Sequence, residues 1–272
     1  MTHGYASING AHLYYEVDGT GPPIVLLHAG VADSRQWNNE FRWLARRARV
    51  VRHDMRGYGK SEPVAGEFTH LGDLIALLDH LRIARPIVAV GCSMGGGLAL
   101  DYALAEPDDV CALVMVGSGP SGLELDVPAL PKFAEVERAF RAGDLDLVCE
   151  LETQIWFDGV GRAPAQVNRE MRQLAYEMNR TVIAHDARRL GTRRRDTESP
   201  AAGRLADVRV PVLVVVGEHD IPYIHAAADY MVERLPSVTR VDIADAAHLP
   251  NMDRPEEFRR ALTAFLDRHI AG

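Results

Sequence analysis

The sequence contains no long apolar run and little cysteine. None of its apolar runs approaches the roughly 18 residues of a membrane-spanning helix, and its first residues lack the basic start and apolar core of a signal peptide. The three cysteines, Cys92, Cys111 and Cys149, are odd in number and widely spaced, which argues against a disulfide framework. We therefore expect a cytoplasmic protein without a membrane partner.

Positive charge is not in excess either. The chain has 30 lysine and arginine residues against 38 aspartate and glutamate residues, a formal net charge of −8. Proteins that bind nucleic acid usually present a basic surface, so this balance argues against a nucleic-acid partner. With 272 residues, 47% of them hydrophobic and 25% charged, the composition is typical of a globular protein with one large domain.

Short apolar stretches alternate with helical patterns along most of the chain. Asn9-Gly10, between two apolar stretches, predicts an N-terminal β-hairpin. Apolar residues at helical spacing within 71–81 predict the crossover helix that parallel strands require, and Pro255 begins a C-terminal amphipathic helix. Together these patterns predict an α/β fold with a mostly parallel sheet. The further strands are expected at 24–27, 50–52, 87–90, 111–116, 210–216 and 238–243.

Residues 122–203 interrupt this alternation. They show helical periodicity and no convincing strand, so we expect a helical cap inserted between two core parts, 1–121 and 204–272. A cap would form the roof of a pocket, and its candidate substrate-binding residues are Trp156, Phe157 and Met178, although packing inside the cap is the favoured role for all three. The arginines of the same region are interpreted as a solvated face in preference to a site for an anionic substrate. They are Arg188, Arg189, Arg193, Arg194 and Arg195.

The clearest chemical signal is the motif Gly91-Cys92-Ser93-Met94-Gly95. It follows a β-branched run and opens a helix-forming stretch, as in a nucleophile elbow, where small flanking residues allow a sharp turn that exposes the central hydroxyl. Ser93 is therefore the predicted nucleophile. Cys92 lies one position away from the apex, and we expect it to be a buried apolar residue and not a catalytic thiol.

A serine nucleophile needs a base, an acid that orients the base, and an oxyanion hole. Asp220 and His248 each follow a predicted strand, so we expect Asp220 to orient His248 and His248 to take the proton of Ser93. The backbone amides of Gly30 and Met94 are the predicted oxyanion donors. Other side chains compete for these roles: Glu218 and Asp245 for the acid, and His28, His53 and His219 for the base.

Two further strings resemble nucleotide-binding motifs but do not complete them. Gly59-Lys60-Ser61 lacks the glycine that a phosphate-binding loop has five residues earlier, where this chain has Asp54. The stretch 117–122 fits Gly-x-Gly-x-x-Gly, but Pro120 interrupts it and no strand with a terminal acid follows at the required distance. No metal-binding signature is present, and we expect no cofactor and no metal.

The chain resembles the α/β-hydrolase superfamily, in the group with a helical lid that includes esterases, enol-lactone hydrolases and cofactor-free haloperoxidases. The elbow motif, Leu-Leu-His-Ala-Gly at 26–30, the run 54–61, Gly217-Glu218-His219-Asp220 and Ala247-His248 carry the resemblance, in order along essentially the whole chain. Family members that open epoxides or displace halide use aspartate at the elbow, so Ser93 disfavours both activities.

The resemblance implies a serine hydrolase that cleaves a small carboxylic ester or lactone through an acyl-enzyme, as a monomer or homodimer. Alternatives on the same residues are an enol-lactone hydrolase of aromatic catabolism, a cofactor-free haloperoxidase or perhydrolase, and a C–C bond hydrolase. A non-enzymatic alternative is a small-molecule sensor that retains the triad.

Overall fold

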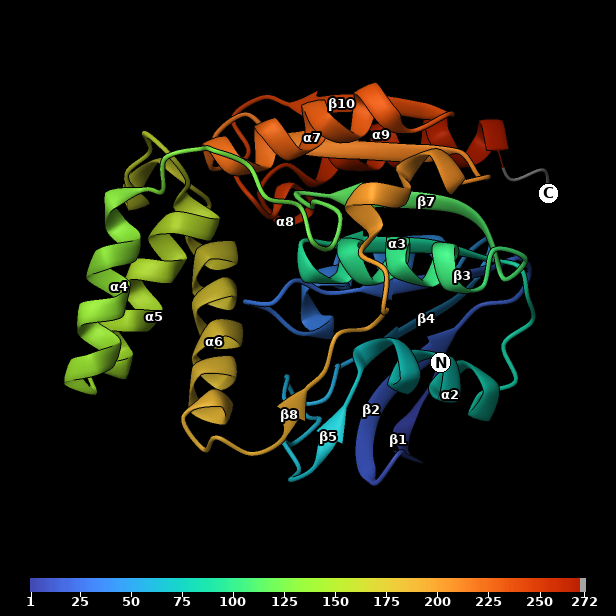
Figure 1. Ribbon diagram of the computed structural model, residues 1–272, viewed down its shortest axis with the longest axis horizontal. Coiled ribbons are helices and arrows are strands. Elements are labelled where there is room, and N and C mark those ends of the chain that lie inside the picture. The colour runs from blue at the N-terminus through green and yellow to red at the C-terminus, as the bar shows by residue number, and fades with distance from the viewer. Residues whose placement is uncertain (270–272) are drawn as a thin grey trace.

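The computed structural model of the chain describes residues 1–269, and an eight-stranded sheet runs through its centre (Figure 1). The strand order is β1-β2-β4-β3-β6-β7-β9-β10. The pairs β1-β2 and β2-β4 are antiparallel, and the other five pairs are parallel. The α/β fold with a mostly parallel sheet is therefore confirmed. The sheet strands are β1 (Thr2–Ile8), β2 (Ala11–Asp18), β3 (Pro23–Leu27), β4 (Arg49–His53), β6 (Ile87–Cys92), β7 (Val110–Val116), β9 (Val212–Gly217) and β10 (Val238–Ile243).

The predicted hairpin and the predicted helices are also present. Asn9 and Gly10 turn between β1 and β2 with φ angles of 47° and 80°, the left-handed region that this dipeptide tolerates. The crossover helix spans His70–His80, and the C-terminal helix begins at Pro255. The helices that flank the sheet are α1 (Asn38–Leu44), α2 (His70–His80), α3 (Met94–Ala105), α7 (Pro222–Arg234), α8 (Pro250–Asp253) and α9 (Pro255–His269).

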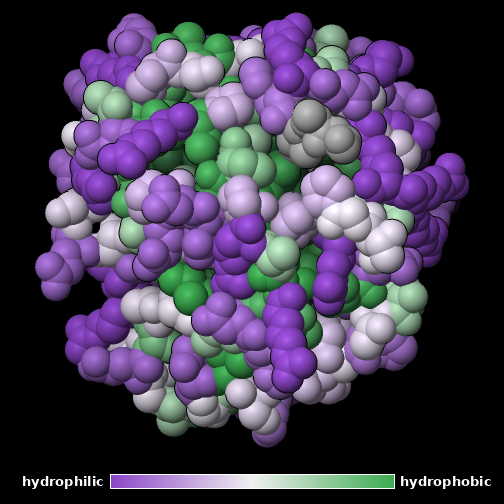
Figure 2. Space-filling model, turned by 90° about the vertical axis from the view of Figure 1, so that its right-hand side faces the viewer, coloured by the Kyte–Doolittle hydropathy of each residue, from purple (hydrophilic) through white to green (hydrophobic). Residues whose placement is uncertain are grey.

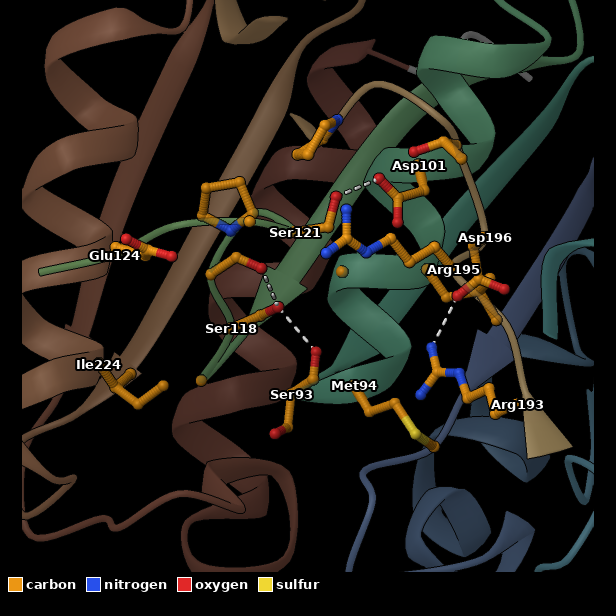
Figure 3. A pocket seen from close by; sticks show the side chains of 18 of the residues that line it. Ser93, Met94, Asp101, Ser118, Ser121, Glu124, Arg193, Arg195, Asp196 and Ile224 are labelled. Carbon is orange, nitrogen blue, oxygen red and sulfur yellow. Dashed lines mark hydrogen bonds and ion pairs between the residues drawn. The ribbon is translucent and has the colours of Figure 1, made fainter. Parts of the chain in front are cut away.

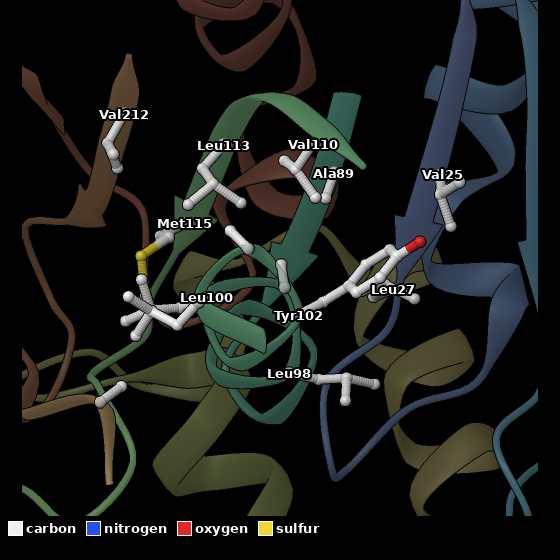
Figure 4. Packing of buried hydrophobic residues seen from close by; sticks show 14 of the residues in the cluster. Val25, Leu27, Ala89, Leu98, Leu100, Tyr102, Val110, Leu113, Met115 and Val212 are labelled. Carbon is white, nitrogen blue, oxygen red and sulfur yellow. The ribbon is translucent and has the colours of Figure 1, made fainter. Parts of the chain in front are cut away.

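Side chains of the parallel strands alternate between two apolar layers. On β3, Val25 and Leu27 pack in the layer formed with α2, α3 and α7, whereas Ile24 and Leu26 pack in the layer formed with α1 and α9. Figure 4 shows part of the first layer around α3, with Leu113 and Ala89 of the strands on one side of the helix and Leu98 on the other. Burial on both faces explains why these strands are continuous apolar runs in the sequence.

A helical segment, residues 122–203, lies between β7 and β9. Its helices are α4 (Pro131–Ala142), α5 (Leu145–Thr153) and α6 (Arg169–Asp186), and they stand together at the left of the sheet in Figure 1. The expectation of no strand in this segment is wrong, because the segment contains one short strand. β8 (Thr192–Arg193) pairs in parallel with β5 (Glu67–Phe68), because the chain returns from α6 past the loop that precedes α2.

The end of the molecule away from α4, α5 and α6 is mainly hydrophilic. Figure 2 shows this face as a mixture of hydrophilic and pale residues, with apolar residues visible in separate areas between them. Such a mixture is ordinary for a folded surface. Among residues 1–269, no helix is long and apolar enough to cross a membrane.

Candidate active site

Ser93 is the single residue between the end of β6 and the start of α3. Its backbone has φ 52° and ψ −115°, a strained combination for a residue with a side chain. Its amide donates to the carbonyl of Val116 and its carbonyl accepts from the Ser118 hydroxyl at 2.7 Å, so the neighbouring strand β7 holds the turn in place (Figure 3). This strained backbone conformation of Ser93 is the geometry of a nucleophile elbow.

The glycines on either side of Ser93 are required by close backbone contacts. A Cβ on Gly91 would lie 2.1 Å from the carbonyl oxygen of Gly95, and a Cβ on Gly95 would lie 2.4 Å from the carbonyl oxygen of Leu27. Both distances are too short for any side chain. The start of α3 therefore packs directly against the ends of β6 and β3.

His248 and Asp220 form a buried pair. The imidazole Nδ1 lies 2.9 and 3.0 Å from the two carboxylate oxygens of Asp220, and the two residues are 1% and 3% exposed. The carboxylate also accepts from the amide of Ile221 at 2.7 Å. Because Nδ1 faces the acid, the carboxylate fixes the orientation of the ring and directs Nε2 away from Asp220.

The pair lies beside the strand end that carries Ser93. A Cβ on Gly117, at the end of β7, would be 3.1 Å from His248 Nδ1 and 3.2 Å from an Asp220 oxygen. The Cys92 thiol, next to Ser93, donates to the His248 carbonyl at 3.6 Å. The structure thus gathers all three predicted residues at adjacent strand ends. Within residues 1–269 the Ser93 hydroxyl itself makes no hydrogen bond to the imidazole.

The competing acids lie at the surface. Glu218 and Asp245 are exposed, and the Glu218 carboxylate accepts from the Asp245 amide at 3.0 Å. Together with His219 they form the one group in residues 1–269 whose ligand atoms approach one another as metal ligands do, within 4.8 Å. None of these three side chains belongs to the pair formed by Asp220 and His248. The carboxylate that the histidine contacts is therefore that of Asp220.

The competing histidines have other partners or surroundings. His28 donates from Nδ1 to the Ala29 carbonyl and accepts at Nε2 from the Met55 amide. His53 is enclosed, and burial lowers its pKa to about 3, so the ring stays neutral. His219 bonds to the Val160 carbonyl at 2.9 Å. His248 is the histidine that contacts the Asp220 carboxylate.

The two predicted oxyanion donors belong to residues that lie close together. A Cβ on Gly30 would lie 3.7 Å from Met94 Cβ, so the loop after β3 runs beside the first residue of α3. Within the described part of the chain neither amide donates a hydrogen bond to a protein acceptor. A helix start with a free amide beside a second free amide is suited to hold a negatively charged oxygen.

Cys92 is buried as the sequence predicts. Its side chain is fully enclosed in the apolar layer on the α1 and α9 side, and burial raises the pKa of the thiol to about 12. A thiol in this state is protonated at neutral pH and is a weak nucleophile.

A cavity of about 770 Å³ opens on the Ser93 side of the turn (Figure 3). That volume suits a small organic molecule. Its walls come from the start of α3, the loop after β7 and a stretch of chain after α6 that we call the strap, residues 192–200. The loop residues Ser118 and Ser121 were missed by the sequence analysis, although their position directly after a strand could have indicated them.

The three predicted cap residues take different positions, and none lines this cavity. Phe157 and Met178 are fully buried in the apolar layer on the α1 and α9 side, so they take the packing role that the sequence favoured and not the candidate substrate-binding role. The Trp156 ring lies against the His248 ring, with 4.5 Å between centroids. It covers the imidazole and limits contact of the pair with water.

Residues 22–255 match the family model described as the alpha/beta hydrolase fold, and the chain belongs to that family. One similar protein is pimeloyl-acyl-carrier-protein methyl ester esterase of Nitrosospira multiformis, 26% identical over 93% of this chain and 97% of that protein. Another is 2-hydroxy-6-oxo-6-(2'-aminophenyl)hexa-2,4-dienoic acid hydrolase of Metapseudomonas resinovorans, 27% identical over 97% and 90% of the two chains. The solved structure of Est816, an N-acyl homoserine lactone degrading enzyme, superposes with a TM-score of 0.77 at 26% identity, covering 96% of this chain and all of that one.

Proposed function

We propose that the protein is a serine hydrolase that cleaves a small carboxylic ester or lactone through an acyl-enzyme. The observation that carries the proposal is the strained serine at position 93 beside a buried aspartate and histidine pair and two unbonded amides. The relatives add support, because one is named as an ester hydrolase and one as a lactone-degrading enzyme.

In the acylation step the Ser93 oxygen attacks the carbonyl carbon of the substrate while its proton passes to His248 Nε2. The carbonyl π electrons move onto oxygen, and the amides of Gly30 and Met94 stabilise that oxyanion. When the intermediate collapses, His248 returns the proton to the departing alcohol, and the acyl group stays on Ser93. Asp220 stabilises the transient imidazolium and stays ionised.

In the deacylation step water takes the place of the serine hydroxyl. His248 removes a proton from water, the resulting hydroxide attacks the acyl carbon, and the proton then goes to the Ser93 oxygen as the acid product leaves. The acylation step needs the Ser93 hydroxyl within hydrogen-bond distance of Nε2. Such bonds are often long or absent before a substrate is bound.

Loss of the serine hydroxyl tests the proposal most directly. We expect Ser93→Ala to lower kcat for p-nitrophenyl butyrate by roughly 10⁴-fold to 10⁶-fold, with the fold retained in circular dichroism. A fluorophosphonate should label Ser93 in the parent protein, as peptide mass mapping would show. Parental turnover by Ser93→Ala, or labelling at another residue, would refute the proposal.

A second candidate reaction is hydrolysis of a carbon–carbon bond. The relative named as a dienoic acid hydrolase has a substrate without an ester, so its hydrolysis divides a carbon chain beside a ketone. A panel with a p-nitrophenyl ester, a lactone and a β-diketone separates the two reactions. The proposed ester or lactone activity predicts that kcat/KM is lowest for the β-diketone.

A further inference from the structure

The strap is fixed to the core at three places. β8 pairs with β5, and Arg194 forms an ion pair with Glu67 on that strand. Asp196 is almost fully enclosed and accepts from the Leu71 amide at the start of α2, at 2.9 Å. Because backbone and side chains both attach it, the strap forms a defined wall of the cavity that contains Ser93.

The arginines of the strap are not used in the same way. Arg193 donates to Asp196 at 2.6 Å, and Arg194 is paired with Glu67. Arg195, the next residue, forms no ion pair or hydrogen bond through its side chain within residues 1–269. Figure 3 shows its guanidinium reaching across the cavity toward Ser121, whereas the Arg193 guanidinium is bonded to Asp196.

The acids that share the cavity leave this guanidinium available. Asp101 accepts from the Ser121 hydroxyl at 2.7 Å, and burial raises its pKa. Glu124 is exposed, so water screens it. Asp196 already bonds to Arg193 and to the amide of Leu71.

We propose that Arg195 binds a carboxylate carried by the substrate, so that the preferred substrate is an ester or lactone with an anionic group at its far end. The proposal rests on the hydrolase function proposed above. A guanidinium presents a planar pair of donors that matches a carboxylate, and a rigid strap holds it at a fixed place relative to Ser93. This replaces the solvated role that the sequence analysis favoured for Arg195.

Matched esters test the proposal. The substrates are p-nitrophenyl half-esters of adipate, pimelate and suberate, neutral acyl esters of equal chain length, and esters with a terminal ammonium, each corrected for spontaneous hydrolysis. We expect kcat/KM for the best half-ester to exceed that of its neutral match by about 10-fold, as a charge-assisted bond at a partly exposed arginine predicts. The preference should shrink in 1 M NaCl.

Variants then assign the preference to one side chain. Arg195→Gln should lower kcat/KM for the half-ester to the value for the neutral ester. Arg195→Lys should keep part of the preference, because lysine keeps the positive charge but lacks the planar pair of donors of the guanidinium. The control is Arg188→Gln, an exposed arginine of the same basic stretch that pairs with Glu62 outside the cavity. It should keep the parental preference.

The outcomes separate this inference from the hydrolase function. If neutral esters are cleaved but Arg195→Gln keeps the preference for half-esters, or the parent prefers the ammonium ester, the carboxylate site is refuted and the hydrolase stands. If no ester is cleaved, the hydrolase function fails. Calorimetric binding of monomethyl adipate to Ser93→Ala, with loss in Ser93→Ala/Arg195→Gln, would then still support the carboxylate site, and equal binding would refute it.

Discussion

The sheet and the helical segment hold their polar groups in different ways. At the strand ends, backbone packing around glycine positions Ser93, and a chain of hydrogen bonds supports the nearby loop: Gln36 accepts from the Ala29 amide and bonds to Asn251, which donates to Glu40. In the helical segment, ion pairs between arginine and carboxylate side chains hold the polar groups in place. Arg172 binds both Asp158 and Glu150 there.

The difference follows from the apolar area that each region can bury. The sheet has a helix layer on both faces, so its strand ends are fixed by packing and tolerate neutral polar networks. The helical segment has a small apolar cluster of its own, formed by residues such as Val148 and Ile183, and is attached to the core by apolar side chains such as Phe157 and by the ion pair of Arg162. We infer that the proposed reacting groups depend on backbone packing, and that the walls of the pocket depend on ion pairs.

The largest effect is expected where an ion pair joins the two regions. Arg162 of the helical segment binds Asp253, which also accepts from the Ala247 amide next to His248. Arg162 and Asp253 are 5% and 1% exposed, so Arg162→Gln leaves a buried carboxylate short of its main partner. We expect the free energy of unfolding to fall by about 3 kcal/mol in urea titrations, together with a lower kcat.

The matched control for Arg162 is an ion pair at the surface of the same segment. Arg141 and Glu137 are 72% and 62% exposed, and Arg141→Gln should change stability by no more than about 0.5 kcal/mol. If the two substitutions changed the free energy of unfolding equally, the distinction between a buried ion pair that joins the regions and an exposed ion pair would be wrong.

A smaller effect is expected from the glycine contacts in α3. Gly95→Ala places a methyl group 2.4 Å from a backbone oxygen, which must displace the start of the helix and should lower stability by about 1 to 3 kcal/mol. Gly97→Ala is the control in the same helix, because its nearest foreign atom would be 3.5 Å away. We expect it to raise thermal stability slightly, since alanine favours helix. A neutral Gly95→Ala would contradict the steric account of the turn.

The last effect depends on pH and concerns the neutral network at Glu40. Burial raises the pKa of this carboxyl to about 7, above its ordinary value of 4.5, so the folded protein binds a proton more tightly than the unfolded chain does. The free energy of unfolding should therefore fall as pH rises from about 4.5 to about 7. Glu40→Gln removes this loss and should be more stable than the parent by up to about 3 kcal/mol at pH 8, with little difference at pH 4.5.

The control for Glu40 is an exposed acid. The Glu233 side chain is 69% exposed, and Glu233→Gln should leave the pH dependence of chemical denaturation unchanged. If Glu40→Gln instead loses stability at pH 8, the carboxyl is ionised and paired in the folded protein, and the interpretation of the Glu40 network as neutral is wrong.

Most of the fold could be predicted because local patterns agree with the tertiary structure. The buried runs of β6 and β9 are apolar along their whole length, and Asn9-Gly10 specifies its turn by backbone preference alone. The short pair of β5 and β8 could not be predicted, since two residues carry no period and the pairing joins distant parts of the chain. Packing was the favoured role for Phe157 and Met178, but the sequence could not show that they pack in the layer with α1 and α9, because no local pattern records which distant element covers an apolar side chain.

By itself the sequence determined the order of strands and helices, the sharp turn around Ser93, and the positions of Asp220 and His248 at strand ends. These features depend on local backbone preference and on periodicity, which are encoded in neighbouring residues. Only the tertiary structure decided that Trp156 lies against His248, which layer Phe157 and Met178 pack in, and that three of the five arginines line the cavity. Those outcomes depend on contacts between residues far apart in the chain, and no local pattern records them.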